Sequence, residues 1–121
     1  MNVIEVAAGL VFHGGKLLIT QRFQAAHLGG LWEFPGGKRE ADESFENCLI
    51  RELREELGIE VIVGSVIEDL THQYPEKKVR LRFFLCGLKR NSPMPSPIGC
   101  AAVAWVTSTE LGGYVFPGAD E

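Results

Sequence analysis

The chain has 121 residues, enough for one domain with one hydrophobic core, and we expect a single domain over 1–121. Its 45% hydrophobic and 23% charged residues are typical of a soluble globular protein. The formal net charge of -4 argues against binding of long nucleic acid, which needs a basic face, but leaves a small anionic substrate open if a metal supplies positive charge.

Two further features favour a cytoplasmic protein without a membrane partner. The N-terminus lacks a basic region followed by an apolar one, and no apolar run reaches membrane-spanning length. Cys48, Cys86 and Cys100 are an odd, scattered set, which favours buried, reduced thiols over a disulfide framework. We expect a monomer or a weak dimer.

Strands are predicted to outnumber helices along the chain. The predicted strands are 3–12, 16–21, a short extended piece at 31–34, 59–66, 79–88 and 101–106. Turns are expected at 13–15, at 35–37 and at 74–77, and the last of these would join 79–88 to an extension of 59–66. Loops are expected at 23–30 and 91–99, and one helical turn at 108–111. One long amphipathic helix covering a mixed sheet indicates an α+β fold.

That helix is predicted to follow Ser44, a good N-cap residue. Phe45, Leu49, Leu53 and Leu57 recur every four residues and form one apolar stripe. Gly58 suits the left-handed position just after the helix. The expected helix therefore spans about three turns and buries its leucines.

The acids on this helix have a spacing that folding alone would not favour. Glu52, Glu55 and Glu56 stand at i, i+3 and i+4, so their carboxylates share one face. Like charges at these spacings repel by roughly 0.2–0.5 kcal/mol per pair. The first candidate for a ligand of this acidic face is a hard cation such as Mg²⁺. A solvated acidic face without a bound ion is the simpler alternative.

The residues around the three acids favour the metal. Gly36 and Gly37 permit a backbone carbonyl to turn toward a ligand, and carboxylates from the helix would complete an oxygen-rich site. Arg51 is expected to pair with Glu43 or another acid and to hold the carboxylates in place. The chemistry expected of such a site is attack of water on a phosphoanhydride.

The segment from Gly37 to Ile59 resembles the Nudix box, G-x5-E-x7-R-E-U-x-E-E-x-G-U, where U is aliphatic. Every fixed position is filled, by Gly37, Glu43, Arg51, Glu52, Leu53, Glu55, Glu56, Gly58 and Ile59. The similarity extends through HLGGLWEFPGGK, YPEKKVRLRFFL, AWV and FPGAD, and is closest to the MutT branch.

This resemblance implies an α/β/α sandwich and a Mg²⁺- or Mn²⁺-dependent hydrolase that splits a nucleoside triphosphate into the monophosphate and pyrophosphate. The substrate that this resemblance suggests first is 8-oxo-dGTP. The protein would then remove oxidised nucleotides from the nucleotide pool. Glu52, Glu55, Glu56 and the carbonyl of Gly36 or Gly37 would be metal ligands, with Arg51 and Glu43 in support.

Candidate substrate contacts lie outside the box. Arg22 is a candidate phosphate contact or an ordinary surface arginine, and His27 a loop residue with a possible substrate role. Phe34 either packs on the base or belongs to the core. Tyr74 and Lys77 line up with positions near the base in MutT-like chains.

Asp120 is the clearest indication of specificity. MutT-like proteins carry an Asn here that reads the base edge, whereas an ionised Asp only accepts hydrogen bonds and would suit the exocyclic amine of cytosine. The run IEVAAGL and the terminal Ala-Asp also resemble CTP pyrophosphohydrolases. A cytosine nucleotide is therefore the alternative substrate, and a solvated tail residue the alternative interpretation of Asp120.

One expected acid is missing. MutT-like enzymes often carry a further glutamate before the last strand, but residues 91–104 contain no Asp or Glu, and Gly99 or a neighbour stands near that position. The general base is then a box glutamate, or the metal activates the water without one. A nucleotide-binding module that has lost turnover is the alternative of another class.

Overall fold

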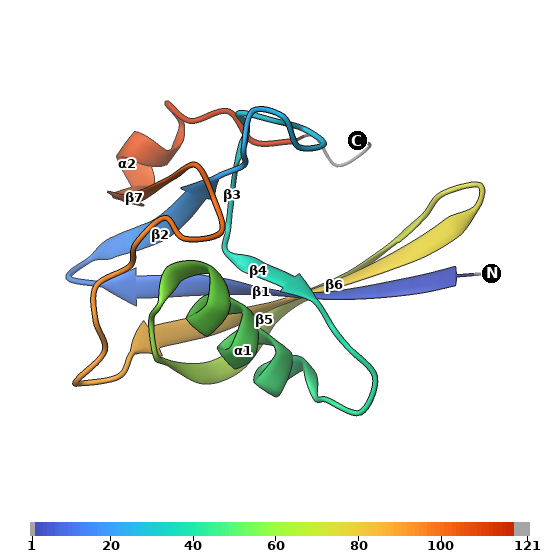
Figure 1. Cartoon of the computed structure of the whole chain (residues 1–121), viewed down its shortest axis with the longest axis horizontal. Coiled ribbons are helices and arrows are strands. Elements are labelled where there is room, and N and C mark those ends of the chain that lie inside the picture. Colours follow the sequence, from blue (N-terminus) through green and yellow to red (C-terminus); the bar gives the residue numbers. More distant parts are fainter. Residues whose placement is uncertain (1, 118–121) are drawn as a thin grey trace.

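The computed structural model describes residues 2–117. Its elements follow one another from the N-terminus as shown in Figure 1. They are β1 (Asn2–His13), β2 (Lys16–Gln21), β3 (Trp32–Glu33), β4 (Gly36–Lys38), α1 (Phe45–Leu57), β5 (Val61–Gln73), β6 (Lys77–Leu88), β7 (Ala102–Val106) and α2 (Ser108–Leu111).

The strands form one mixed sheet in the order β3-β2-β1-β6-β5. β1 and β6 pair in parallel from Asn2 with Lys77 to Phe12 with Gly87, and the other pairs are antiparallel. β4 pairs with β1 and β7 pairs with β2. In Figure 1, β2, β3 and β7 rise away from the long ribbon that β1, β5 and β6 form.

α1 confirms the predicted helix at both ends. The Ser44 hydroxyl accepts a hydrogen bond from the Asn47 backbone N–H, and Gly58 ends the helix with a left-handed φ of 70°. Leu49 and Leu53 are fully buried against the sheet. Burial of such a side chain contributes roughly 1.5–3 kcal/mol, so packing holds α1 in place more firmly than helix propensity does.

The α+β architecture is confirmed, with α1 on one face of the mixed sheet. The second helix expected in the sandwich is short: α2 has four residues, is capped by Thr107 and contacts β7. Neither helix in the described part of the chain is long and apolar enough to cross a membrane.

The glycines at 36–37 do not form the turn that was predicted. Pro35 makes the bend, and Gly36–Lys38 is strand β4, paired with β1. A side chain on Gly36 would overlap the carbonyl oxygen of Ala7. Glycine is therefore needed at this position so that β4 can approach β1 closely.

The β5–β6 hairpin confirms the expected extension of the first strand toward a turn at 74–77, since β5 runs to Gln73 and β6 begins at Lys77. Asp69 pairs with Arg80 at 3.1 Å and with Arg82 at 3.0 Å. These ion pairs are cross-strand neighbours, which apolar periodicity along one strand does not reveal.

The cysteines confirm the expectation of buried thiols. Cys48, Cys86 and Cys100 are all free and buried. Burial raises the pKa of Cys48 to about 11 and the pKa of Cys86 to about 12. Neither thiol therefore has the thiolate character that a catalytic cysteine needs.

Candidate active site

Arg51 ties the acidic face of α1 to the loop before it. Its Nη2 lies 2.8 Å from Glu43 Oε1 and donates to the Lys38 carbonyl at 3.2 Å. Its Nη1 lies 3.1 Å from Glu55 Oε1 and 3.5 Å from Glu52 Oε2. The pairing of Arg51 with Glu43 that the sequence predicted is therefore present.

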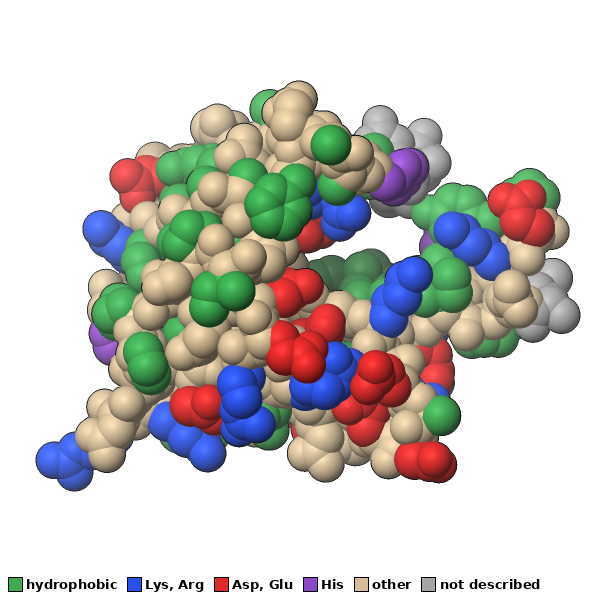
Figure 2. Space-filling model, in the orientation of Figure 1, with side chains coloured by type: hydrophobic (Ala, Val, Ile, Leu, Met, Phe, Trp, Pro, Cys, Tyr) green, Lys and Arg blue, Asp and Glu red, His purple; other side chains and the backbone are tan. Residues whose placement is uncertain are grey.

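Glu43 is the most strongly stabilised carboxylate of this network. The Arg51 guanidinium, followed by the Glu40 backbone N–H, lowers the pKa of Glu43 to about 2. Glu43 therefore stays ionised and keeps Arg51 directed toward the acids of α1. Figure 2 shows acidic side chains gathered over α1 and the loop that precedes it, beside a hollow that opens toward the β5–β6 hairpin.

β4 brings backbone atoms against these carboxylates. A Cβ atom on Gly37 would overlap the Glu52 carboxylate, so only glycine permits this approach. Gly37 lies opposite Ala7 in the β1–β4 ladder. On one side of this pair, Gly9 N donates to Pro35 O at 2.8 Å, and on the other side Arg39 N donates to Glu5 O at 2.7 Å.

This register decides between the two candidate carbonyls. In an antiparallel ladder, Gly37 directs its C=O at β1, whereas the neighbouring residues direct theirs away. The Lys38 carbonyl accordingly accepts from Arg51 on the α1 side. The Gly36 carbonyl is expected to share that direction. Of the two carbonyls named as candidate ligands it is therefore the better suited to join a metal site, whereas the Gly37 carbonyl accepts from the Cys48 thiol at 3.5 Å.

The donor set fits a hard divalent cation in its chemistry, because carboxylate and carbonyl oxygens are what Mg²⁺ prefers. Within residues 2–117, however, no three acidic, His or Cys side chains converge closely enough to hold a metal ion. Arg51 pairs with Glu52 at 3.5 Å and with Glu55 at 3.1 Å, whereas Glu56 lines a separate pocket.

Glu56 lies in a small polar pocket of about 130 Å³. The pocket is lined by Thr20, Arg22, Phe23, Ala26, Glu33, Glu56, Gly99 and Cys100. Burial, and then the charges of Glu52, Glu33 and Glu55, raise the pKa of Glu56 to about 7. Concentrated negative charge with little solvent is the environment that a bound cation would relieve.

Two residues of this pocket bear on the sequence predictions. Arg22 donates to the carboxylate of Glu33 at 3.1 Å and to the His27 carbonyl at 2.6 Å, so it joins β2, β3 and the loop between them. The His27 side chain is exposed. Gly99 donates its N–H to the Glu56 carbonyl at 2.9 Å, which places it beside the box where the missing acid was expected.

Phe34 is part of an aromatic cluster on the face of the sheet opposite α1. Its ring centroid lies 5.3 Å from that of Phe116 and 6.3 Å from that of Phe83. The C-terminal segment is brought there by a hydrogen bond from Trp32 N to Val115 O of 2.8 Å. Phe34 is partly exposed, so it is not a fully buried core residue.

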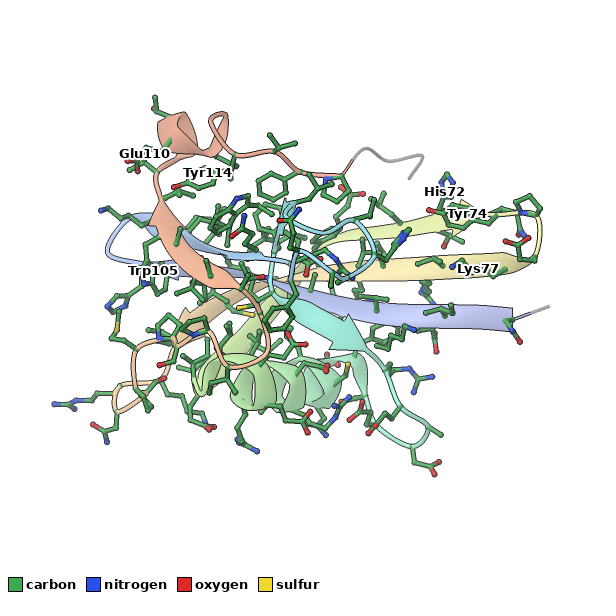
Figure 3. All side chains as sticks on the ribbon, turned by 45° about the horizontal axis from the view of Figure 1, so that its top comes forward. His72, Tyr74, Lys77, Trp105, Glu110 and Tyr114 are labelled. Carbon is green, nitrogen blue, oxygen red and sulfur yellow. The ribbon has the colours of Figure 1, made fainter. Side chains whose placement is uncertain are left out.

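Tyr74 and Lys77 lie at the tip of the β5–β6 hairpin. The Lys77 ammonium is 5.5 Å from the centroid of the Tyr74 ring, which is 4.3 Å from the His72 ring. Figure 3 places all three at the far end of the ribbon from Trp105 and Tyr114. Asp120 lies outside the described residues.

Sequence reasoning missed Glu33 and Phe83. Alternation along an extended piece would have placed Glu33 on the opposite side from Phe34, toward Arg22. For Phe83, the sequence indicated only a position in a strand and gave no sign of a contact with Phe34. A larger depression of about 460 Å³, lined by Glu60, Ile62, Lys89, Arg90, Asn91 and Ser92, contains none of the predicted site residues.

Comparison with known proteins identifies the family of the chain. A family model described as a NUDIX domain matches residues 7–121. The 8-oxo-dGTP diphosphatase of Escherichia coli K12 is 32% identical over 100% of this chain and 93% of its own length. The CTP pyrophosphohydrolase of the same organism is 52% identical over 55% of this chain, a match that spans half of that relative.

Solved structures share the fold of this chain. The solution structure of the E. coli ORF135 protein has a TM-score of 0.82 and 35% identity, covering 99% of this chain and 84% of the other. MutT of Aliivibrio salmonicida and Vibrio cholerae gives a TM-score of 0.77 and 32% identity, covering 99% of this chain and 92% of the other. The chain belongs to the Nudix hydrolase family, in its MutT-like branch, and is a pyrophosphohydrolase.

Proposed function

We propose that this Nudix hydrolase cleaves a (d)NTP, in the presence of Mg²⁺, to the (d)NMP and pyrophosphate, with an oxidised nucleotide such as 8-oxo-dGTP as substrate. One observation supports this most directly. Glu33 lines the pocket of Glu56, while the next residue, Phe34, joins the aromatic cluster. The acidic centre and an aromatic surface suited to a nucleobase are thus contributed by adjacent residues, which point to opposite sides of one extended segment.

The metal would be held by Glu52, Glu55, Glu56 and the Gly36 carbonyl. A divalent cation, Mg²⁺ or Mn²⁺, neutralises charge on phosphate oxygens and lowers the pKa of a bound water. Arg51 and Glu43 keep the carboxylates of α1 in position, since the Arg51 guanidinium contacts Glu43, Glu52 and Glu55 at once.

Arg22 and Phe34 supply the substrate contacts in this proposal. Two of the three Arg22 guanidinium nitrogens are engaged by Glu33 and by the His27 carbonyl, so a phosphate oxygen would use the remaining one. Phe34 offers an aromatic face for the base, and stacking of this kind contributes roughly 1–3 kcal/mol per base. Tyr74 and Lys77 would approach the base from the hairpin.

The test is a nucleotide panel with the purified protein. Canonical (d)NTPs, 8-oxo-dGTP and modified cytosine nucleotides are incubated with Mg²⁺ and, separately, with Mn²⁺, and pyrophosphate is measured. We expect release from at least one, with the highest kcat/KM for 8-oxo-dGTP. No pyrophosphate from any nucleotide with either metal would end this proposal.

CTP or a modified cytosine nucleotide is the second candidate. Support comes from Asp120 and from the 52% identity to a CTP pyrophosphohydrolase. Asp120→Asn should then shift the preference from cytosine toward guanine nucleotides, and an unchanged ranking would argue against this candidate. A binding module without turnover has less support, since all the box glutamates are kept.

A further inference from the structure

The pocket beside Glu56 receives no carboxylate from the loop before β7. Residues 91–104 contain no Asp or Glu. The loop nevertheless touches Glu56, because Ile98 and Gly99 donate their N–H groups to its carbonyl at 3.1 and 2.9 Å. A Cβ atom on Gly99 would lie 3.0 Å from Glu56 Cγ. The loop therefore contacts Glu56 through backbone N–H groups and lines the pocket with Gly99 and Cys100, neither of which carries a carboxylate.

The opposite wall of the same pocket carries an acid. Glu33 on β3 pairs with Thr20 on β2, and cross-strand partners present their side chains on one face. Thr20 is 4% exposed and also lines the pocket. Glu33 thus stands on a paired strand whose neighbour is buried, which limits its movement.

Arg22 positions the Glu33 carboxylate. Its Nη1 lies 3.1 and 3.4 Å from the two carboxylate oxygens, while its Nε is fixed on the His27 carbonyl. The Arg22 and Glu33 side chains are 31% and 41% exposed. Solvent-screened pairs of this kind contribute little energy, so the pair can yield to a stronger partner of Glu33.

A cation is such a partner. Glu33 and Glu56 line one pocket of about 130 Å³. Two carboxylates facing one small space repel each other unless positive charge lies between them. Arg22 supplies part of that charge from the rim.

We propose that Glu33 supplies the carboxylate that completes the divalent-cation site from the sheet side, in place of the acid absent from the loop before β7. Glu33 would act together with Glu56, and Arg22 would hold it between the site and the substrate phosphates. This inference rests on the metal site of the proposed function and adds a residue from outside the box.

The first test measures metal binding without substrate. Mn²⁺ alone is titrated into the protein and free Mn²⁺ is followed by electron paramagnetic resonance. For Glu33→Gln we expect the Mn²⁺ dissociation constant to rise roughly ten-fold, as is usual when a supporting residue of a metal site is lost. Glu46→Gln, which removes an exposed carboxylate in the first turn of α1, should bind Mn²⁺ as the wild type does.

Mn²⁺ binding by Glu33→Gln at wild-type affinity would overturn the proposal. In that case Glu33 only neutralises Arg22, and the variant should show a lower KM for nucleotide from the freed guanidinium. If Glu33→Gln does not fold, Glu33→Asp gives the second measurement. The Asp side chain is one methylene shorter, so its carboxylate lies farther from the site. If this variant bound Mn²⁺ as tightly as the wild type does, the proposal would equally be overturned.

The double variant Glu33→Gln, Gly99→Glu asks whether the position of the carboxylate matters. The new side chain would start 3.0 Å from Glu56 Cγ and return an acid to the same pocket. Recovery of Mn²⁺ affinity would support the proposal. These results do not depend on turnover, so a wild type that releases no pyrophosphate would contradict the proposed function and leave the Mn²⁺ comparison valid.

Discussion

The box region and the β5–β6 hairpin are held together in different ways. In the box region, Leu49 and Leu53 are fully buried, Gly37 abuts the Glu52 carboxylate, and Arg51 bridges α1 to the preceding loop. In the hairpin, residues 68–73 are exposed, and the strands are held by backbone pairing and by the ion pairs of Asp69. In the proposed function, the residues that carry the chemistry lie on the packed element, and the proposed base contacts Tyr74 and Lys77 lie on the hairpin.

Removing the charge of Glu56 should give the largest effect. Glu56→Gln keeps the shape of the side chain, so the fold should persist while the rate of pyrophosphate release falls by roughly 10²–10⁴-fold. The measurement is kcat on the best nucleotide of the panel, with circular dichroism melts to check folding. A variant that retains activity within a few-fold of the wild type would show that Glu56 is dispensable.

Adding one methyl group at Gly37 should displace the Glu52 carboxylate and so lower the rate of pyrophosphate release. The Cβ of Gly37→Ala would overlap the Glu52 carboxylate, and misplacement by about 1 Å costs on the order of 10²-fold in rate. Gly87→Ala is the matched control, because its Cβ would meet no atom within 4 Å. Equal activity of the two variants would mean that the contact between Gly37 and Glu52 has no catalytic importance.

Truncating Lys77 should change binding and leave the chemical step unchanged. We expect Lys77→Ala to raise KM about 2–5-fold, the size of an exposed cation–π contact, with kcat unchanged. Lys78→Ala is the control, since successive residues of a strand face opposite sides. A fall in kcat for Lys77→Ala would contradict the division between the two regions.

The smallest effect is on the pH dependence of stability. The pKa of Glu56 is raised from 4.5 to about 7 in the fold, so the unfolded chain ionises first. The contribution of Glu56 to stability is therefore present below pH 4.5 and is lost as the pH rises toward 7. With EDTA present, urea unfolding should show the stability of the wild type relative to Glu56→Gln falling between pH 4.5 and about 7. A constant difference over this range would argue that Glu56 is not buried.

Local signals were sufficient for the helix and its acids. Ser44, the leucine stripe and Gly58 predicted α1 because capping and 3.6-residue periodicity depend on neighbours in sequence. The same reasoning was wrong at 35–37, because whether two glycines turn or pair depends on β1, which lies about 30 residues earlier. It also did not reveal the ion pairs of Asp69, since they join two strands.

The amino-acid sequence alone specified the reaction class, since Glu52, Glu55, Glu56, Arg51 and Glu43 lie within one short segment whose helical spacing sets their common face. Folding brought in the partners from distant segments: Glu33 from β3, Gly99 from the loop before β7, and the Gly36 carbonyl from β4. Such contacts follow from strand pairing and burial, which are set by residues far apart along the chain. The absence of an acid from residues 91–104 was visible in the sequence, but Glu33, the side chain proposed to replace it, could be identified only from the folded chain, where it lines one pocket with Glu56.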